Sequence, residues 1–196
     1  MREILQYSLS DILKTVYALL ITRVFYRGAR LIRRPFHIRG KRNLKYGKNF
    51  TTGYSCRFEL FGGEGCLSMG DNCNLGDNVH LVASDSVVIG NNFLSASKVF
   101  ISDTSHGNYS LFKGKISDPK QPPNERPLHS VPVSIGNNVW LGENVVVLPG
   151  SKIGDNCIVG SNAVVSGEIP SDSIALGIPA KVIKRYDYEE EAWIRL

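Results

Sequence analysis

The sequence predicts an all-β fold in which short strands wind into a triangular coil, and three observations predict it. From residue 135 onward an aliphatic side chain recurs at every sixth position: Ile135, Leu141, Val147, Ile153, Val159 and Val165. Glycine directly follows most of these anchors, and a small or medium-sized side chain lies four residues after each of them. Because six is not close to a multiple of the ~3.6 residues per turn of an α-helix, the period indicates short strands that meet at turns.

Weaker copies of the repeat precede this block, at Tyr46-Gly47, Thr52-Gly53, Met69-Gly70, Leu75-Gly76 and Ile89-Gly90. We expect each hexapeptide to form one flat side of the coil with its anchor pointing inward. Glycine and asparagine at the corners accept backbone angles that other residues avoid. Phase slips before Met69 and before Ile89 predict loops at corners, where a repeat coil tolerates insertions. A β-sandwich with many turns is the alternative.

The predicted organisation has three parts. Residues 1–36 form an N-terminal amphipathic basic helical segment, residues 37–185 form the coil with a protruding loop at 107–131, and residues 186–196 form a helical cap. The loop abandons the six-residue period and contains a proline-rich stretch, and proline stiffens an extended excursion. Long loops that leave a rigid scaffold are usually functional.

A helix is predicted over residues 4–32. Apolar side chains recur there at helical spacing, at Leu5, Leu9, Ile12, Leu13, Val16 and Leu20. Arginines follow at spacings of three or four, at Arg23, Arg27, Arg30 and Arg34, which predicts one basic stripe. An apolar face joined to an arginine face is typical of a helix that lies in a membrane surface. The alternative is a helix packed on the coil with solvated arginines.

Charge is divided unevenly along the chain. Residues 1–48 carry a net charge of +10 and the remainder a net charge of −5, so we expect an anionic partner for the N-terminal end alone. The charge-free window at residues 15–22 is far shorter than the ~20 residues that cross a bilayer, and no cleavable signal is visible, so neither a spanning helix nor a leader is expected. Nucleic acid is not expected as a partner, because no recognition motif accompanies the basic residues.

The four cysteines form no C-x-x-C pair, which argues against a zinc knuckle or a redox pair. Cys56, Cys73 and Cys157 fall on the small inward position of the repeat. We therefore expect reduced core thiols in a cytoplasmic protein.

Four longer strings add a resemblance to this pattern: IGNN at 89–92, ISDTSHG at 101–107, IGNNVWLG at 135–142 and GIPAKVIK at 177–184. Through them the sequence resembles the hexapeptide-repeat acyltransferases. It is most similar to the galactoside and maltose O-acetyltransferases and above all to the bacterial O-acetyltransferases of lipopolysaccharide O-antigen assembly. The resemblance covers about residues 46–184 and implies a left-handed parallel β-helix.

The resemblance also implies acetyl-CoA as co-substrate, no metal, and a histidine as general base. In the family the base follows the first repeat block and precedes the long loop, and His106 holds this place. A histidine with a pKa near ~6.5 can accept the proton of a sugar hydroxyl as the new bond forms. Asp103, three residues earlier, is predicted to orient the ring or to stabilise its charge. Many relatives carry a second histidine where this chain has Thr104.

Further candidates follow from matching positions in the family, which lays the pantetheine arm of CoA along the groove between adjacent turns. The CoA candidates are Gly142, Glu143, Ser161, Ser166 and Gly167, with Trp140 as a wall of the site and Lys181 and Lys184 for the phosphates. The acceptor candidates are Asn78 and His80. His129, at the end of the loop, is a further candidate for reaching a neighbouring site.

These expectations combine into an O-acetyltransferase of cell-surface polysaccharide biosynthesis that moves acetyl from acetyl-CoA to a sugar hydroxyl. The enzyme is expected in the cytoplasm, in peripheral contact with the inner face of the cytoplasmic membrane. It is expected to be a homotrimer and to act on a sugar or lipid-linked glycan acceptor. Three alternatives remain open at this point: a sugar N-acyltransferase, a non-catalytic scaffold in a glycan-assembly complex, and a metal enzyme of the γ-carbonic-anhydrase type.

Overall fold

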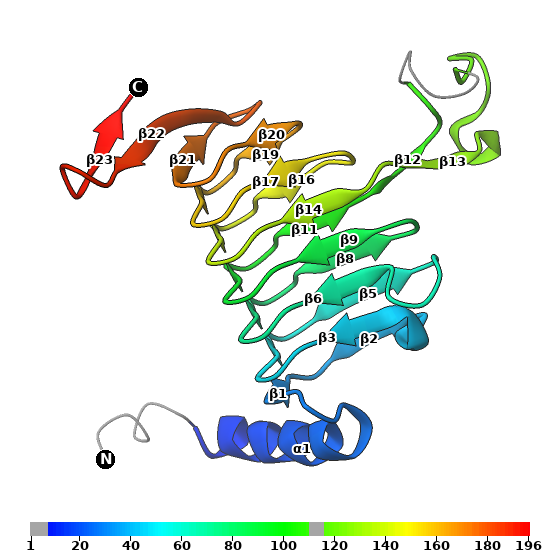
Figure 1. Cartoon of the computed structure of the whole chain (residues 1–196). Helices are drawn as coiled ribbons and strands as arrows, with labels where there is room; N and C mark the ends of the chain where they lie inside the picture. The colour runs from blue at the N-terminus through cyan, green and yellow to red at the C-terminus, as the bar shows by residue number, and fades with distance from the viewer. Residues whose placement is uncertain (1–7, 110–115) are drawn as a thin grey trace.

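A computed structural model describes residues 8–109 and 116–196 of the chain. Within these residues the chain winds into a coil with three flat sides, and each side is a sheet of short parallel strands (Figure 1). Successive turns visit the three sheets in the same order, so strands that are distant in sequence become neighbours. The predicted all-β parallel β-helix is confirmed.

The three sheets, here called A, B and C, have the following strand orders in the described residues. Sheet A runs β1 (Leu31–Ile32), β4 (Thr51–Thr52), β7 (Asn74–Leu75), β10 (Leu94–Ser95), β15 (Trp140–Leu141), β18 (Ile158–Val159), β21 (Ser173–Leu176), β22 (Lys181–Asp187) and β23 (Ala192–Arg195). Sheet B runs β2 (Phe36–Arg39), β5 (Cys56–Leu60), β8 (His80–Ala83), β11 (Phe100–Ser102), β16 (Val146–Val147) and β19 (Val164–Val165). Sheet C runs β3 (Leu44–Tyr46), β6 (Leu67–Met69), β9 (Val87–Ile89), β14 (Val133–Ile135), β17 (Lys152–Ile153) and β20 (Glu168–Ile169).

The core consists of rows of inward side chains that the parallel register stacks on one another. One row in sheet B is formed by Phe58, Leu81, Ile101, Val147 and Val165, each paired with the next and each buried. Because strand side chains alternate between the two faces, the residues on either side of each anchor point outward. The hexapeptide anchors therefore fill the core, as predicted.

All four cysteines are buried and free, which agrees with the prediction for three of them. Burial raises the pKa of the Cys56 thiol to about 11. A thiol with so high a pKa carries almost no thiolate at neutral pH and is correspondingly unreactive.

The corners between the sheets differ in character. We call them corner AB (residues 142–145 in one turn), corner BC (148–151) and corner CA (154–157). At corner CA a column of side chains sits in the left-handed backbone region, which asparagine accepts better than most residues. Each of these side chains bonds to the next at 2.8–3.0 Å, and the column is Asn49, Asn72, Asn92, Asn138, Asn156 and Asp172. The Tyr188 hydroxyl donates to Asp172 at 2.9 Å and closes this asparagine ladder.

Both predicted corner loops lie at corner BC. The first joins β5 to β6 and the second joins β8 to β9. A third and larger excursion, the arm (residues 104–131), leaves the same corner between β11 and β14 and projects from the coil (Figure 1). The predicted loop at 107–131 is part of this arm, and residues 110–115 lie outside the described residues.

The arm is more regular than predicted. β12 (Thr104–His106) pairs antiparallel with β13 (Leu128–Ser130), and a 3-10 turn, η3 (Pro123–Glu125), precedes β13. A second 3-10 turn, η2 (Lys41–Asn43), lies at corner BC near the start of the coil.

The predicted helical cap at residues 186–196 is wrong. This segment completes β22 and forms β23, an antiparallel hairpin that continues sheet A from the edge of β21. Aromatic side chains favour strands, and the Tyr186 ring packs edge-on against Trp193 with centroids 5.3 Å apart. The hairpin thereby covers the edge that β21 would otherwise leave unpaired.

The predicted helix over residues 4–32 is shorter in the structure. α1 spans Leu9–Phe25 and begins at a capping box formed by Ser8 and Asp11, while residues 4–7 lie outside the described residues. It ends at Tyr26, whose backbone leaves the helical region with φ at −135° and ψ at 66°, and Gly28 then takes a left-handed angle, with φ at 90°. The coil therefore begins at β1 rather than at residue 37. Of the predicted arginine stripe only Arg23 lies on the helix.

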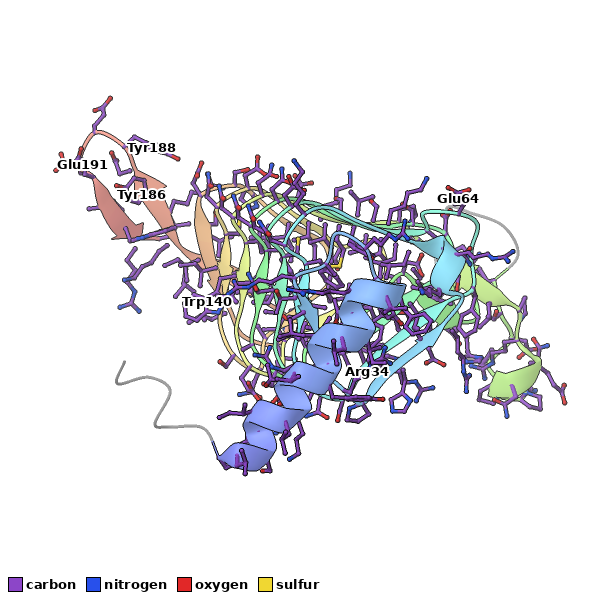
Figure 2. The ribbon with its side chains drawn as sticks, turned by 90° about the horizontal axis from the view of Figure 1, so that it is seen from below. Arg34, Glu64, Trp140, Tyr186, Tyr188 and Glu191 are labelled. Carbon is purple, nitrogen blue, oxygen red and sulfur yellow. The ribbon has the colours of Figure 1, made fainter. Side chains whose placement is uncertain are left out.

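α1 lies across the N-terminal end of the coil, which Figure 2 shows from below. Its small side chains face the coil: Ala18 and Thr22 are buried, and the Thr22 hydroxyl accepts from the backbone N–H of Ile32 at 2.9 Å. Its large apolar side chains are exposed, namely Leu9, Ile12, Leu13, Val16, Tyr17, Leu20, Val24 and Phe25. No helix among the described residues is both long and apolar enough to cross a membrane.

Candidate active site

His106 lies at the foot of the arm, at the end of β12, and is exposed. The arm holds its backbone: the Tyr109 hydroxyl donates to the His106 carbonyl at 2.5 Å, and Arg126 Nη1 donates to the Tyr109 hydroxyl at 2.8 Å. The His106 ring makes no hydrogen bond to any described residue. An imidazole held by its backbone but free at its ring nitrogens can accept a proton from a bound molecule.

His129 does not share the His106 side of the arm. It pairs with Ser105 in the β12–β13 register, whereas His106 pairs with Leu128. Because neighbouring positions of a strand face opposite sides, the two histidine side chains lie on opposite faces of this two-stranded sheet. The His129 Nε2 is buried without a hydrogen-bond partner in the described part of the chain.

Asp103 lies at corner BC and is completely buried. Its carboxylate accepts backbone N–H bonds from Ser84 at 2.9 Å, Asp85 at 2.7 Å and Ser86 at 2.8 Å, and the Thr104 hydroxyl donates to it as well. The three backbone contacts go to the loop of the preceding turn, the fourth goes to the first residue of the arm, and none goes to the His106 ring. The structure thus places Asp103 where it holds the backbone from which the arm departs.

Corner AB brings together four of the predicted residues: Asn78, Gly142, Glu143 and Ser161. The Glu143 N–H donates to the Ser161 hydroxyl at 3.2 Å, and the Glu143 carboxylate accepts from the backbone N–H of Ser97 at 3.0 Å. A Cβ on Gly142 would lie 2.7 Å from the backbone nitrogen of Ser161, so the close approach of these two turns requires glycine.

Lys98 also lies at corner AB and was not predicted from the sequence. Its ammonium lies 4.0 Å from the Glu143 carboxylate. Its backbone φ of 59° matches that of Asn78 and Asn144 in the neighbouring turns. The sequence could have indicated this residue, because Lys98 occupies a corner position that asparagine occupies in the two neighbouring turns.

Trp140 and Lys184 lie in one outward row of sheet A. The register joins Trp140 to Ile158, Ile158 to Ile174, and Ile174 to Lys184. The Trp140 side chain is 48% exposed, which suits a wall of an open site. Lys181 pairs with Leu176 farther along the same hairpin.

Ser166 and Gly167 lie at corner BC, in the last turn that passes it, and both are exposed. The predicted CoA residues are therefore divided among corner AB, the outer face of sheet A and corner BC. Within one chain, sheet B separates corner AB from corner BC, where His106 leaves the coil.

His80 lies on the outer face of sheet B, between these two corners. Its Nε2 is 3.0 Å from Glu59 Oε2, and its ring lies against Phe100 with centroids 5.2 Å apart. Arg57 donates to Glu59 Oε1 at 2.7 Å. The hydrogen bond from Arg57, and then the one with His80, holds the pKa of the Glu59 carboxyl below its ordinary value of 4.5.

Arg57 and Glu59 were not predicted from the sequence either. They occupy alternate positions of β5, whose inward side chains Cys56, Phe58 and Leu60 are buried. The alternation of apolar and charged residues over 56–60 was the signal that could have placed both on the outer face.

Across the described residues, no group of three or more His, Cys, Asp or Glu side chains could hold a metal ion.

Known proteins resemble this chain at the level of both sequence and fold. A family model described as bacterial transferase hexapeptide (six repeats) matches residues 132–167. WbbJ of Escherichia coli strain K12, provisionally described as a lipopolysaccharide biosynthesis O-acetyl transferase, is 45% identical over 188 residues, which cover 96% of this chain and 95% of WbbJ. The galactoside O-acetyltransferase of the same organism is 34% identical over 124 residues, which cover 60% of this chain and 56% of that enzyme.

Two solved structures share the fold. A galactoside acetyltransferase in complex with coenzyme A is 29% identical, has a TM-score of 0.52, and matches 71% of this chain and 66% of its own. AntD, an N-acyltransferase from Bacillus cereus in complex with dTDP and 3-hydroxybutyryl-CoA, has a TM-score of 0.67 over 94% of this chain and 91% of its own. At 16% identity, the likeness to AntD concerns the fold alone.

Proposed function

Because the chain belongs to the hexapeptide-repeat acetyltransferases, we propose that it transfers acetyl from acetyl-CoA to a sugar hydroxyl in the assembly of a cell-surface polysaccharide such as lipopolysaccharide O-antigen. The observation that carries this proposal is the His106 imidazole, which is exposed at the foot of the arm with both ring nitrogens free of described partners. The 45% sequence identity to WbbJ, which extends over 96% of this chain, supports a sugar of lipopolysaccharide as the acceptor.

The proposed reaction is a direct transfer. The sugar oxygen attacks the thioester carbonyl carbon while His106 accepts the hydroxyl proton, a contribution of about 10²–10⁴ in rate. The carbon–sulfur bond then breaks, the acetyl ester is released, and the imidazolium returns its proton to the CoA thiolate. A backbone N–H of the coil is proposed to meet the developing negative charge on the carbonyl oxygen. Asp103 acts as a positioning residue, since its contacts hold the backbone at the start of the arm.

We assign CoA to corner AB and the outer face of sheet A. Gly142, Glu143 and Ser161 would line the pantetheine arm, with Trp140 as a wall. Ser166 and Gly167 lie across sheet B from this position, at corner BC, and their CoA role rests on the family resemblance alone. The ammonium groups of Lys181 and Lys184 suit the phosphates, and Lys98 adds a third cation at corner AB. Asn78 and His80 remain the acceptor candidates.

A homotrimer is part of the proposal. Sheet B lies between corner AB and His106 within one chain, so a neighbouring copy can bring its own CoA groove to the His106 of the first. Sedimentation of the purified protein tests this: three copies per particle are expected, and a monomer with full activity would contradict it.

A peripheral place at the inner face of the cytoplasmic membrane is also proposed. It is supported by the exposed apolar side of α1, where Leu9 is 73% and Val24 66% exposed, and by the arginines that follow it. Such a face beside basic residues is suited to a lipid surface.

The decisive experiment supplies purified protein with labelled acetyl-CoA and a glycan acceptor and follows the label. If mild alkali releases the label from the product, the label is held as an ester, which supports the O-acetyltransferase. If the product is stable in alkali, the label is held as an amide, which indicates a sugar N-acyltransferase. Absence of CoA binding by calorimetry would favour a non-catalytic scaffold. Mass spectrometry of the polysaccharide with and without the gene then locates the acetyl group on its sugar.

A further inference from the structure

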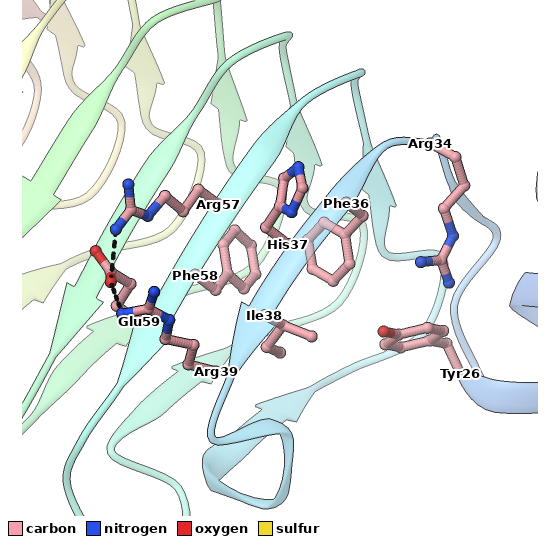
Figure 3. A pocket seen from close by; sticks show the side chains of 9 residues that line it. All are labelled: Tyr26, Arg34, Phe36, His37, Ile38, Arg39, Arg57, Phe58 and Glu59. Atoms are coloured by element: carbon pink, nitrogen blue, oxygen red, sulfur yellow. Dashed lines mark hydrogen bonds and ion pairs between the residues drawn. The ribbon is translucent and has the colours of Figure 1, made fainter.

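A pocket of about 590 Å³ opens at the N-terminal end of the coil, beside the C-terminal end of α1 (Figure 3). Phe36 and Phe58 form its apolar wall, and Tyr26 closes one side. Three arginines line it: Arg34 at one end, and Arg39 and Arg57 at the other. No residue predicted from the sequence as catalytic, CoA-binding or acceptor-binding lines this pocket.

The charges of the pocket are unbalanced. Arg39 Nη1 lies 3.2 Å and Arg57 Nη2 lies 2.7 Å from the same oxygen of Glu59. One carboxylate therefore serves two guanidinium groups, and it is shared with His80 as well. Among the described residues, Arg34 has no ion pair. The pocket consequently carries an excess of positive charge.

Arg34 is the residue that points to a ligand. Its guanidinium stacks on the Tyr26 ring, 5.6 Å from the centroid. Its Nε is buried and has no hydrogen-bond partner in the described part of the chain. A buried N–H of a charged group costs folding free energy when it has no hydrogen-bond partner. The neighbouring apolar wall lowers the local dielectric constant and so strengthens any hydrogen bond that an anion makes there. A tetrahedral anion with several acceptor oxygens matches such a guanidinium.

The pocket also lies in line with the candidate active site. β2 is the edge strand of sheet B, and β5, which carries Arg57 and Glu59, is two strands away from β11, which leads directly to His106. At a spacing of ~4.8 Å between strands, β5 is about 10 Å from β11, whereas Arg34, which precedes β2, is three strands or about 14 Å from β11 and lies toward the opposite end of the strands from His106. A molecule that reaches both Arg34 and His106 must therefore extend over several sugar-phosphate units.

We propose that this pocket binds the phosphate or diphosphate group of the acceptor, which makes the acceptor a sugar attached to a phosphate-bearing carrier. The inference rests on the proposed function for the identity of the sugar substrate, but the binding of phosphate does not depend on acetyl transfer. The carrier is either a lipid headgroup or a soluble nucleotide, since both present the same anionic oxygens to Arg34.

Calorimetric titration of the full chain with inorganic pyrophosphate tests the site. We expect saturable binding that Arg34→Gln weakens about tenfold or more. Arg33→Gln is the matched control, because Arg33 bonds to the Thr52 carbonyl at 3.3 Å and lies against Tyr54, outside the pocket. We expect it to change the affinity by less than about twofold, because the Arg33 guanidinium does not line the pocket. No binding by the wild type, or equal weakening by both variants, would overturn the proposal.

A second variant keeps the test decisive if Arg34→Gln does not fold. The Arg39 side chain is 72% exposed, so Arg39→Gln is expected to fold normally and to weaken pyrophosphate binding about threefold or more. Unchanged binding in a folded Arg39→Gln protein would then overturn the proposal.

Two further arms separate the sources of phosphate and separate this inference from the proposed function. If Arg34→Gln, and not Arg33→Gln, weakens binding of uridine diphosphate, the carrier is a nucleotide. If Arg34→Gln weakens binding to phosphatidylglycerol vesicles and Arg33→Gln does not, the carrier is a lipid. An effect on neither overturns the site. Titration with CoA serves as the independent readout: normal CoA binding without pyrophosphate binding rejects the pocket alone, and pyrophosphate binding without CoA binding rejects the acetyltransferase alone.

Discussion

His106 and Asp103 lie three residues apart and have opposite surroundings. The imidazole is exposed and free of described partners, while the carboxylate is buried and accepts three backbone N–H bonds. A group that takes part in proton transfer must be reachable, and a group that fixes backbone must be satisfied where it is. In the proposed mechanism, His106 therefore takes part in the reaction and Asp103 positions the backbone.

Replacing His106 by alanine is expected to lower the rate of acetyl transfer by about 10²–10⁴-fold, because the nearby His129 lies on the opposite face of the β12–β13 sheet and cannot replace it. The melting temperature should stay within about 1 °C of the wild type, since an exposed ring without described hydrogen bonds adds little stability. Transfer of labelled acetyl and a thermal melt measure the two effects. Full activity in a folded His106→Ala protein would remove the general-base assignment.

Asp103→Asn tests positioning. The amide has one acceptor oxygen and no charge, so the three N–H groups of the Ser84–Ser86 loop lose a charged acceptor and the Thr104 hydroxyl loses the second oxygen, at a cost of about 1–3 kcal/mol in the free energy of unfolding. We expect kcat to fall as the arm shifts, with the KM for acetyl-CoA unchanged. Asp85→Asn, an exposed carboxylate in the same loop, is the matched control. Loss of stability with an unaltered kcat would leave Asp103 a purely structural residue.

The ionised Glu59 carboxylate is expected to make a pH-dependent contribution to the free energy of unfolding. Its pKa is lowered in the folded chain from an ordinary value of 4.5, chiefly by the hydrogen bond from Arg57. A lowered pKa stabilises the fold above the unfolded value, and this stability is lost as the pH falls below about 4.5 and through the folded value. Urea titrations should thus show Glu59→Gln less stable than the wild type at pH 7, with the gap narrowing in acid. A gap that stays constant down to pH 3 would contradict this.

At the scale of elements, the corners organise the coil as much as the strands do. At corner CA the hydrogen-bonded side chains of the asparagine ladder join successive turns, whereas corner BC contains two loops and the arm. The regular corner keeps successive turns in register. The irregular corner presents His106 and its surroundings.

The asparagine ladder can be tested at its middle. Asn138→Gly removes the two side-chain bonds to Asn92 and Asn156 but tolerates the φ of 56°, and should cost about 1–3 kcal/mol in unfolding free energy. Asn138→Ala removes the same bonds and also strains the left-handed backbone, at about 1–2 kcal/mol more. Denaturant unfolding compares the two. If alanine were no worse than glycine, backbone conformation would not explain the asparagines.

α1 yields a prediction about surfaces. Leu13→Ser combined with Leu20→Ser is expected to weaken binding to phosphatidylglycerol vesicles at least about tenfold, because two exposed leucines lose their transfer into lipid. Val88→Ser, an exposed apolar residue on sheet C, is the control and should bind as the wild type does. A change in oligomeric state without a change in vesicle binding would instead make this face a contact between copies.

At the scale of the molecule, the sequence predicted what its repeat encodes directly. Inward anchors such as Leu141 and Val159 recur at a fixed spacing, and the three sheets follow from that spacing alone. The hairpin at residues 181–195 could not be predicted in this way, because its strand character depends on pairing with β21, and the acidic run after Tyr188 matched a helix equally well.

Residues of the candidate site could be predicted from the sequence where they belong to a continuous motif. They could not be predicted where the coil brings together residues that are distant in the sequence. His106 lies within a string that can be recognised by itself. The partners of Asp103, by contrast, lie in a loop at the second phase slip, some twenty positions earlier, and only the stacking of turns brings them to its carboxylate. Arg34 belongs to a predicted helical stripe, and its true place became visible once the helix ended at Phe25.

The contrast between the two kinds of corner has a consequence for how relatives of this protein diversify. An insertion at the asparagine column would break a chain of side-chain bonds that runs the length of the prism, so selection is expected to hold that edge at constant length. Corner BC already accepts excursions of several lengths without disturbing the stack. Differences in chain length between relatives are therefore expected at corner BC and not at corner CA.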